Sequence, residues 1–133
     1  MPALQTHPWV TVDGLVLQDG KLVAVIRRNP PFQGMPAIPG GFVELGETTE
    51  AAVVREVREE TGLATRVLHM VGVYSDPSRD PRGHTVTVAY ALEATGGVLR
   101  AASDAKEVVL LDPDHLPPMA FDHAALVEDW RRA

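Results

Sequence analysis

Residues 41–63 read GFVELGETTEAAVVREVREETGL, and this stretch carries the strongest information about the fold and the chemistry. A glycine-rich turn leads into a helical pattern that contains Glu56, Glu59 and Glu60. Their i, i+3 and i+4 spacing predicts one shared helix face, where like charges repel by roughly 0.2–0.5 kcal/mol per pair. A hard divalent cation would offset this repulsion, because Mg²⁺ and Mn²⁺ bind carboxylate oxygens.

The alternative without a ligand is a solvated acidic face, which is the usual role of clustered glutamates on a helix. The surrounding residues favour the metal site. The segment has Gly41, five residues, Glu47, seven residues, Arg55-Glu56, an aliphatic Val57, one residue, Glu59-Glu60, one residue, Gly62 and an aliphatic Leu63. This pattern resembles the signature of the Nudix hydrolases, with every fixed position filled. The resemblance implies an α/β protein with the Nudix fold, an α-β-α sandwich around a mixed central sheet.

The composition of the 133 residues is that of one globular domain, which we expect to span residues 1–133. The start of the chain lacks the layout of a secretory signal, and no apolar run is long enough to cross a bilayer. The absence of cysteine excludes thiol catalysis and fits a cytoplasmic protein. The net charge of -6 argues against non-specific nucleic-acid binding. We therefore expect neither a nucleic-acid nor a membrane partner.

Hydrophobic alternation and turn residues predict the order of the elements. Two strands, at residues 9–18 and 21–28, should be joined by the turn Asp19-Gly20. The motif helix should begin after the N-cap Thr48, run to about Thr61 and end at Gly62. Further elements are predicted as strands at 65–75, 85–94, 98–100 and 107–111, a tight turn at Gly96-Gly97, and a last helix from the N-cap Asp122 through Trp130.

The resemblance also implies roles for the motif residues. The expected metal ligands are the carbonyl of Gly41 and the carboxylates of Glu56, Glu59 and Glu60, with Mg²⁺ as the cofactor and Mn²⁺ as an expected substitute. Arg55 is expected to pair bidentately with a nearby carboxylate and hold the loop on the helix, the alternative being a surface arginine. Glu47 would either bind metal through water or only shape the turn.

The general base stays open at this point. Glu59 and Glu60 are candidates inside the motif, where either carboxylate could position the attacking water. Outside the motif, the stretch SDAKE at residues 103–107 offers Asp104 and Glu107. The alternative for this stretch is a solvated turn before a strand.

A second segment, residues 74–84, reads YSDPSRDPRGH. It resembles the corresponding segment of microbial ADP-ribose pyrophosphatases, as do residues 103–107 and 116–124. Arg79 and Arg82 are expected to bind pyrophosphate or ribose oxygens, and His84 either binds the same groups or caps the loop. The alternative is a rigid loop that folds on itself without a ligand. The remaining predicted substrate contacts are Arg28 and Phe121.

The base preference stays open. Many relatives carry an aromatic residue where this chain has Pro36, and only 5% of the residues are aromatic. A stacking partner for the base would have to come from Phe32, Tyr74, Phe121 or a second chain.

The implied activity is metal-dependent hydrolysis of a nucleoside diphosphate linked to another group. Conversion of ADP-ribose to AMP and ribose 5-phosphate is the first expectation. A nucleoside triphosphate pyrophosphohydrolase that removes oxidised nucleotides is one alternative. A non-catalytic ADP-ribose sensor is another, against which stand the intact metal motif and the lack of a DNA-binding extension after Ala133. A homodimer is also expected, because a partner would deepen the substrate cleft.

Overall fold

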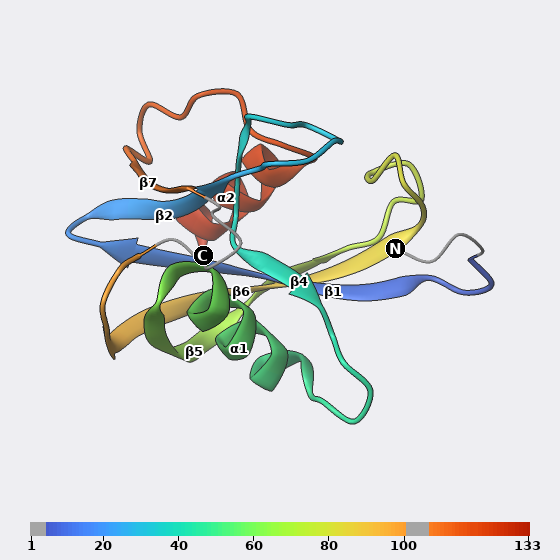
Figure 1. Ribbon diagram of the computed structural model, residues 1–133, viewed down its shortest axis with the longest axis horizontal. Helices are drawn as coiled ribbons and strands as arrows, with labels where there is room; N and C mark the ends of the chain where they lie inside the picture. Colours follow the sequence, from blue (N-terminus) through green and yellow to red (C-terminus); the bar gives the residue numbers. More distant parts are fainter. Residues whose placement is uncertain (1–4, 101–106) are drawn as a thin grey trace.

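A computed structural model of the protein describes residues 5–100 and 107–133 (Figure 1). The described elements, in chain order, are β1 (Trp9–Gln18), β2 (Lys21–Ile26), β3 (Pro36–Ala37), β4 (Gly40–Phe42), α1 (Thr49–Thr61), β5 (Leu63–Tyr74), β6 (Thr85–Gly97), β7 (Glu107–Leu111) and α2 (His123–Arg132). The predicted candidate base Asp104 lies outside the described residues.

The strands form one mixed sheet. Its main order is β3-β2-β1-β6-β5, with β4 paired to β1 and β7 paired to β2. The pair β1–β6 is parallel, whereas the other strand pairs are antiparallel. This arrangement confirms the mixed central sheet.

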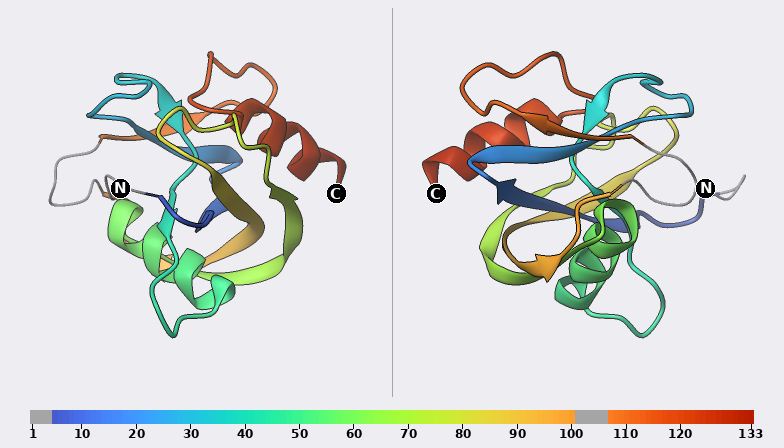
Figure 2. Two further views of the ribbon diagram at one scale, coloured as in Figure 1. Left: turned by 90° about the vertical axis from the view of Figure 1, so that its right-hand side faces the viewer. Right: turned by 60° about the vertical axis from the view of Figure 1, so that its left-hand side comes forward.

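The two helices cover opposite faces of the sheet (Figures 1 and 2). Val12 and Val16 of β1 belong to the core cluster that includes Val53 of α1. Leu15 of β1 belongs to the other cluster, which includes Leu126 of α2. Successive side chains of a strand point to opposite faces, so a strand buried on both sides needs apolar residues at both parities. The α-β-α sandwich is therefore confirmed.

Helix α1 has the predicted caps. The hydroxyl of Thr48 accepts a hydrogen bond from the N–H of Ala51 at 3.0 Å. At the other end, Gly62 adopts φ 83° and donates its N–H to the carbonyl of Arg58. A left-handed backbone of this kind favours glycine. These caps fix where α1 starts relative to β4, and hence where its glutamates lie.

Two local predictions were wrong. Residues 98–100 do not form a strand; instead the N–H of Arg100 donates to the carbonyl of Thr61. The predicted tight turn at Gly96-Gly97 is the end of β6, which pairs there with the start of β5. Asp122 is the N-cap residue of α2, as predicted; its side chain makes no cap bond, because its carboxylate accepts hydrogen bonds from Arg79.

The approach of β4 to β1 depends on Gly40. A Cβ at this position would overlap the carbonyl oxygen of Val12 and the side chain of Asp13. Because backbone cannot move aside as a side chain can, we expect Gly40→Ala to lower the free energy of unfolding by about 1–3 kcal/mol or more. Gly96→Ala is the matched control, since a Cβ there meets nothing within 4 Å, and its effect should stay within about 0.5 kcal/mol. Urea titration of both variants measures the difference; equal stabilities would contradict the close approach.

No helix within residues 5–100 and 107–133 is both long and apolar enough to span a membrane.

Candidate active site

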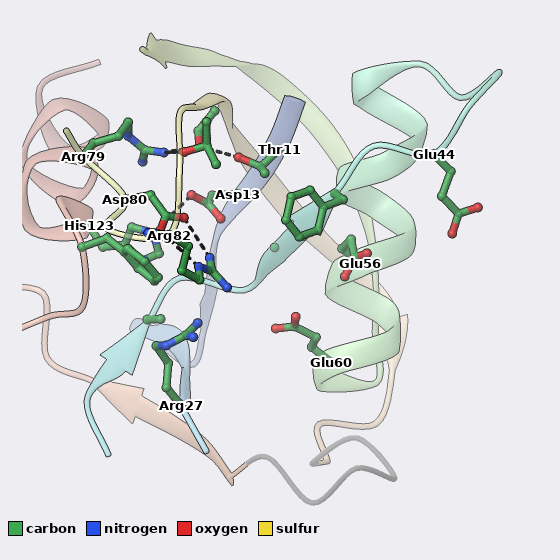
Figure 3. A pocket seen from close by; sticks show the side chains of 17 residues that line it. Thr11, Asp13, Arg27, Glu44, Glu56, Glu60, Arg79, Asp80, Arg82 and His123 are labelled. Atoms are coloured by element: carbon green, nitrogen blue, oxygen red, sulfur yellow. Dashed lines mark hydrogen bonds and ion pairs between the residues drawn. The ribbon is translucent and has the colours of Figure 1, made fainter. Parts of the chain in front are cut away.

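A cavity of about 380 Å³ opens between α1 and the loop that connects β5 to β6 (Figure 3). Glu56 and Glu60 line it from α1, and Gly41 lines it from β4. Arg27 and Arg82 line the side that faces them. The cavity therefore has an acidic wall and a wall that carries guanidinium groups.

The acidic wall brings together three of the four predicted metal ligands. Glu56 and Glu60 are one helical turn apart and both project from α1 into the cavity (Figure 3). The backbone of Gly41 lies directly against Glu56, since a Cβ on Gly41 would fall 2.5–2.7 Å from the carboxylate atoms of that residue. Only a residue without a side chain lets the backbone of β4 and the carboxylate of α1 approach this closely.

The acidic wall fits a cation that completes its shell with other oxygens. No three His, Cys, Asp or Glu side chains in the described part of the chain form a ready-made metal cage. Mg²⁺ typically binds through one or two carboxylates and keeps waters and substrate phosphates as its remaining ligands. Two carboxylates beside a backbone carbonyl match that donor set, and oxygen donors of this kind also suit Mn²⁺.

Glu59 departs from the expectation that it shares this site. Its side chain is 59% exposed and lies 3.3 Å from Arg55, and it does not line the cavity. At 3.6 residues per turn, Glu60 lies about 40° to one side of Glu56 and Glu59 about 60° to the other. The structure therefore separates Glu59, predicted both as a metal ligand and as a base, from Glu56 and Glu60.

Arg55 ties the turn after β4 to α1. Its guanidinium donates to both carboxylate oxygens of Glu47, at 2.7 and 2.9 Å, and to Glu56 at 2.8 Å. A further hydrogen bond, of 3.1 Å, reaches the carbonyl of Phe42. The contact with Glu47 is the bidentate pairing expected of Arg55, and the hydrogen bond to Glu56 holds one of its carboxylate oxygens.

Glu47 shapes the turn in this structure. The hydrogen bonds from Arg55, and then the N–H of Glu44, lower the pKa of Glu47 to about 2. Both of its oxygens are used by these donors, and it does not line the cavity. Of the two roles left open by the sequence, the geometry favours the turn over a metal contact.

The opposite wall presents two arginines held against one aromatic ring. The guanidinium carbons of Arg27 and Arg82 lie 4.9 and 5.5 Å from the ring centroid of Phe121. Arg82 also donates to both oxygens of Asp80. Burial, and then the charge of Arg82, lower the pKa of Arg27. An anionic ligand between these cations would relieve their repulsion.

Phe121 lines the cavity as predicted, but its ring already has several contacts. Besides the two arginines, it packs edge-on against Phe32 at 4.8 Å between centroids and against His123 at 5.4 Å. The ring thus supports the guanidinium groups. It could stack on a nucleobase only if one of these neighbours moved.

Arg79 has mainly internal partners. Its side chain is 6% exposed, and it donates to Asp122 at 2.6 and 2.9 Å and to the hydroxyls of Thr85 and Thr87 at 2.9 and 2.6 Å. Four of the five N–H donors of a guanidinium are therefore used within the protein. Although Arg79 lines the cavity, this pattern favours the structural alternative, in which the loop folds on itself.

Outside the motif, three predicted residues that the structure describes do not line the cavity: His84, Arg28 and Glu107. The Nε2 of His84 lies 3.0 Å from the carbonyl of Ser75, so the ring caps the loop. Arg28 is exposed beyond the end of β2, and its neighbour Arg27 lines the cavity instead. Glu107 is exposed at the start of β7. Side chains of consecutive residues in an extended chain point to opposite sides, so an error of one position exchanges the two.

Three residues that were not predicted from the sequence also line the cavity: Arg27, Asp13 and His123. Asp13 carried a usable signal, because it is a charged residue inside the apolar strand β1 and such positions are seldom buried without a reason. His123 carried none, since its partner Asp13 is far away in the chain.

Comparisons with known proteins identify the family of the chain. Residues 7–130 match the family model described as NUDIX domain. The chain is 50% identical over 129 residues to an ADP-ribose pyrophosphatase of Methanocaldococcus jannaschii, covering 97% of this chain and 76% of that protein.

Two solved structures are similar over nearly the whole chain. The NUDIX domain of Shewanella oneidensis NrtR, crystallised with ADP ribose, has a TM-score of 0.82 and 28% identity, covering 96% of this chain and 89% of that one. A bifunctional NMN adenylyltransferase/ADP ribose pyrophosphatase of Francisella tularensis, complexed with AMP and a Mn ion, has a TM-score of 0.76 and 26% identity, covering 98% of this chain and 43% of that one. The motif, the fold and these matches together show that the chain belongs to the Nudix family.

Proposed function

We propose that this Nudix protein is a metal-dependent ADP-ribose pyrophosphatase that converts ADP-ribose to AMP and ribose 5-phosphate. The observation that carries the proposal is the two-walled cavity, in which Glu56 and Glu60 face Arg27 and Arg82. A diphosphate bridge needs both walls, because its oxygens bind guanidinium groups directly and carboxylates only through a cation. The 50% identity to an archaeal ADP-ribose pyrophosphatase supports the choice of substrate.

In the proposed reaction a water oxygen attacks one phosphorus of the bridge. The bond from that phosphorus to the bridging oxygen breaks, the water loses a proton, and two phosphate monoesters result. Arg27 and Arg82 bind phosphate oxygens and orient the bridge for in-line attack. The second wall, formed by the Gly41 carbonyl with Glu56 and Glu60, would hold Mg²⁺ or Mn²⁺, which supplies positive charge to the phosphates and lowers the pKa of a bound water.

Glu60 is our candidate for the group that positions the water and takes its proton. Of the predicted bases within the described residues, Glu60 lines the cavity, whereas Glu59 and Glu107 do not. Glu60 is only 7% exposed, and exclusion of water strengthens the electrostatic effect of a carboxylate on the reacting atoms.

The test is product identification on a substrate panel. With Mg²⁺, we expect ADP-ribose to give AMP and ribose 5-phosphate in equal amounts by chromatography, and excess EDTA to abolish the reaction. Nucleoside triphosphates, including oxidised ones, are the matched comparison. Preferential release of pyrophosphate and a nucleoside monophosphate from them would instead show a triphosphate pyrophosphohydrolase.

A ligand sensor is the second candidate, favoured by the similarity to the NUDIX domain of NrtR crystallised with ADP ribose. The two candidates differ in turnover. If the purified protein binds ADP-ribose in the presence of Mg²⁺ and Mn²⁺ but releases no AMP, the sensor function replaces the enzymatic one.

We also propose a cytoplasmic homodimer without a nucleic-acid or membrane partner. The net charge of -6 supports the absence of a nucleic-acid partner. Strand β5 lies at the end of the main strand order and carries the exposed apolar side chains of Leu68, Met70 and Val73. Such an edge is a natural place for a second copy. Light scattering measures the molar mass in solution and so tests the homodimer.

A further inference from the structure

Asp13 is a buried carboxylate that the reaction described above does not use. It lies on β1, opposite Gly40 of β4, and lines the cavity although the residue is only 7% exposed. In Figure 3 it projects toward the wall that carries Arg82, away from Glu60. A buried charge is costly unless it is paired or hydrogen-bonded. A purely structural strand position would be filled more stably by an apolar residue.

His123 holds Asp13 in one orientation. The N–H of Ile38 donates to Nδ1 of His123 at 2.9 Å, so Nδ1 is an acceptor and the proton of the neutral ring is on Nε2. Nε2, which faces Asp13, lies 3.3 Å from Oδ2 of that carboxylate. Residues from β1, from the segment before β4 and from the start of α2 together fix this carboxylate.

Asp13 borders the cavity, where a ligand can reach it. An ionised carboxylate has about four acceptor positions, and among the described residues His123 is its ion-pair partner. The neighbouring cavity walls carry Arg27 and Arg82. These cations would repel an amine, and the carboxylate itself would repel a phosphate. A neutral O–H donor satisfies both constraints.

We propose that Asp13 is a specificity-determining residue that accepts a hydrogen bond from a ribosyl hydroxyl of the substrate, and that His123 is its positioning residue. This inference rests on the proposed function, since it assigns a contact to the sugar of a nucleoside diphosphate sugar. The sugar hydroxyl would lie beside Asp13, next to the diphosphate that Arg27 and Arg82 bind on the same side of the cavity. A site built to pair a hydroxyl rejects the analogue that lacks it, because its own acceptor is then left buried and unpaired.

The test compares wild type with Asp13→Asn on ADP-ribose and on analogues that lack one hydroxyl, either on the adenosine ribose or on the terminal ribose. Asparagine keeps an oxygen that accepts from His123 and replaces the other oxygen with an NH₂ group. For the wild type, kcat/KM should fall about 10- to 100-fold for one of the two analogues. For Asp13→Asn, kcat/KM on ADP-ribose should fall by a similar factor, with little further loss on that analogue. The analogue that is rejected identifies the ribose.

A structural role predicts a different pattern. If Asp13 only anchors α2, Asp13→Asn will lower the melting temperature or reduce kcat/KM equally for all substrates, and the inference is then overturned. His123→Gln is the matched control, because its amide can accept from Ile38 and donate to Asp13. This variant should keep the discrimination ratio of the wild type. Should Asp13→Asn fail to fold, equal kcat/KM of the wild type on all three compounds would still refute the contact.

Failure of the proposed function has a separate signature. It appears as absence of AMP release by the wild type, whatever the variants do. In that case the discrimination ratio is read from dissociation constants measured by calorimetry with ADP-ribose and the same analogues. Equal binding of the three compounds, or no binding of any, overturns the inference.

Discussion

Glu60→Gln is expected to lower kcat on ADP-ribose by about 10²-fold or more while leaving the melting temperature near that of the wild type. Glutamine preserves the shape of a side chain that lines the cavity and is 7% exposed, but it removes the negative charge. The charge of Glu60 also acts on Arg27, although burial is the largest influence on the pKa of Arg27 and lowers it. Steady-state kinetics over a Mg²⁺ titration, with a melting curve for each protein, measure both quantities.

Glu59→Gln is the matched control for this change. It is the same substitution on the same helix, one position away, at a side chain that is 59% exposed and paired with Arg55. Since Glu59 does not line the cavity, the loss of kcat should be at least about tenfold smaller than that of Glu60→Gln. Equal losses would show that Glu59 belongs with Glu56 and Glu60, as its spacing in the sequence suggests.

Glu59 and Glu60 show which features of the site the sequence could predict and which it could not. The helix and both of its caps were predictable, because the cap at Thr48 and the turn at Gly62 are local interactions. Spacing also placed three glutamates on one side of the helix. The spacing alone could not decide which glutamate faces the cavity. That depends on where β4 lies against α1 and on the contacts of the Arg55 side chain.

The wall that carries Arg27 and Arg82 was likewise only partly predictable from the sequence. The segment around Arg82 was singled out by its resemblance to microbial ADP-ribose pyrophosphatases. The choice between Arg27 and Arg28, however, depends on the residue at which β2 ends. The pair Asp13–His123 joins residues 110 positions apart, 123 − 13. No local pattern connects two such residues, and only the completed sheet with α2 on its face brings them together.

Arg55→Ala is the second change for which we expect a large effect, a loss of about 10²-fold in kcat/KM. Arg55 donates to Glu47, Glu56 and the carbonyl of Phe42, so its removal releases the turn and one predicted metal ligand together. A displacement of about 1 Å in a catalytic group can cost 10²-fold in rate. Arg58→Ala is the control, because Arg58 is an exposed arginine on the same helix. Comparable losses of kcat/KM in the two variants would show that Arg55 acts only through the positive charge it adds to the helix, and not through its specific contacts.

The stability of Arg55→Ala relative to the wild type should depend on pH in a defined direction. The pKa of Glu47 is lowered in the folded protein from 4.5 to about 2, with the hydrogen bond from Arg55 as the largest cause. A lowered folded-state pKa stabilises the native state above the unfolded-state value, and this contribution disappears as the pH falls through the folded-state value. The difference in melting temperature between the two proteins should therefore be full above pH 4.5 and shrink steadily toward pH 2. Calorimetry across this range measures the difference, and a constant value down to the lowest pH would mean that Arg55 stabilises the turn without the charge of Glu47.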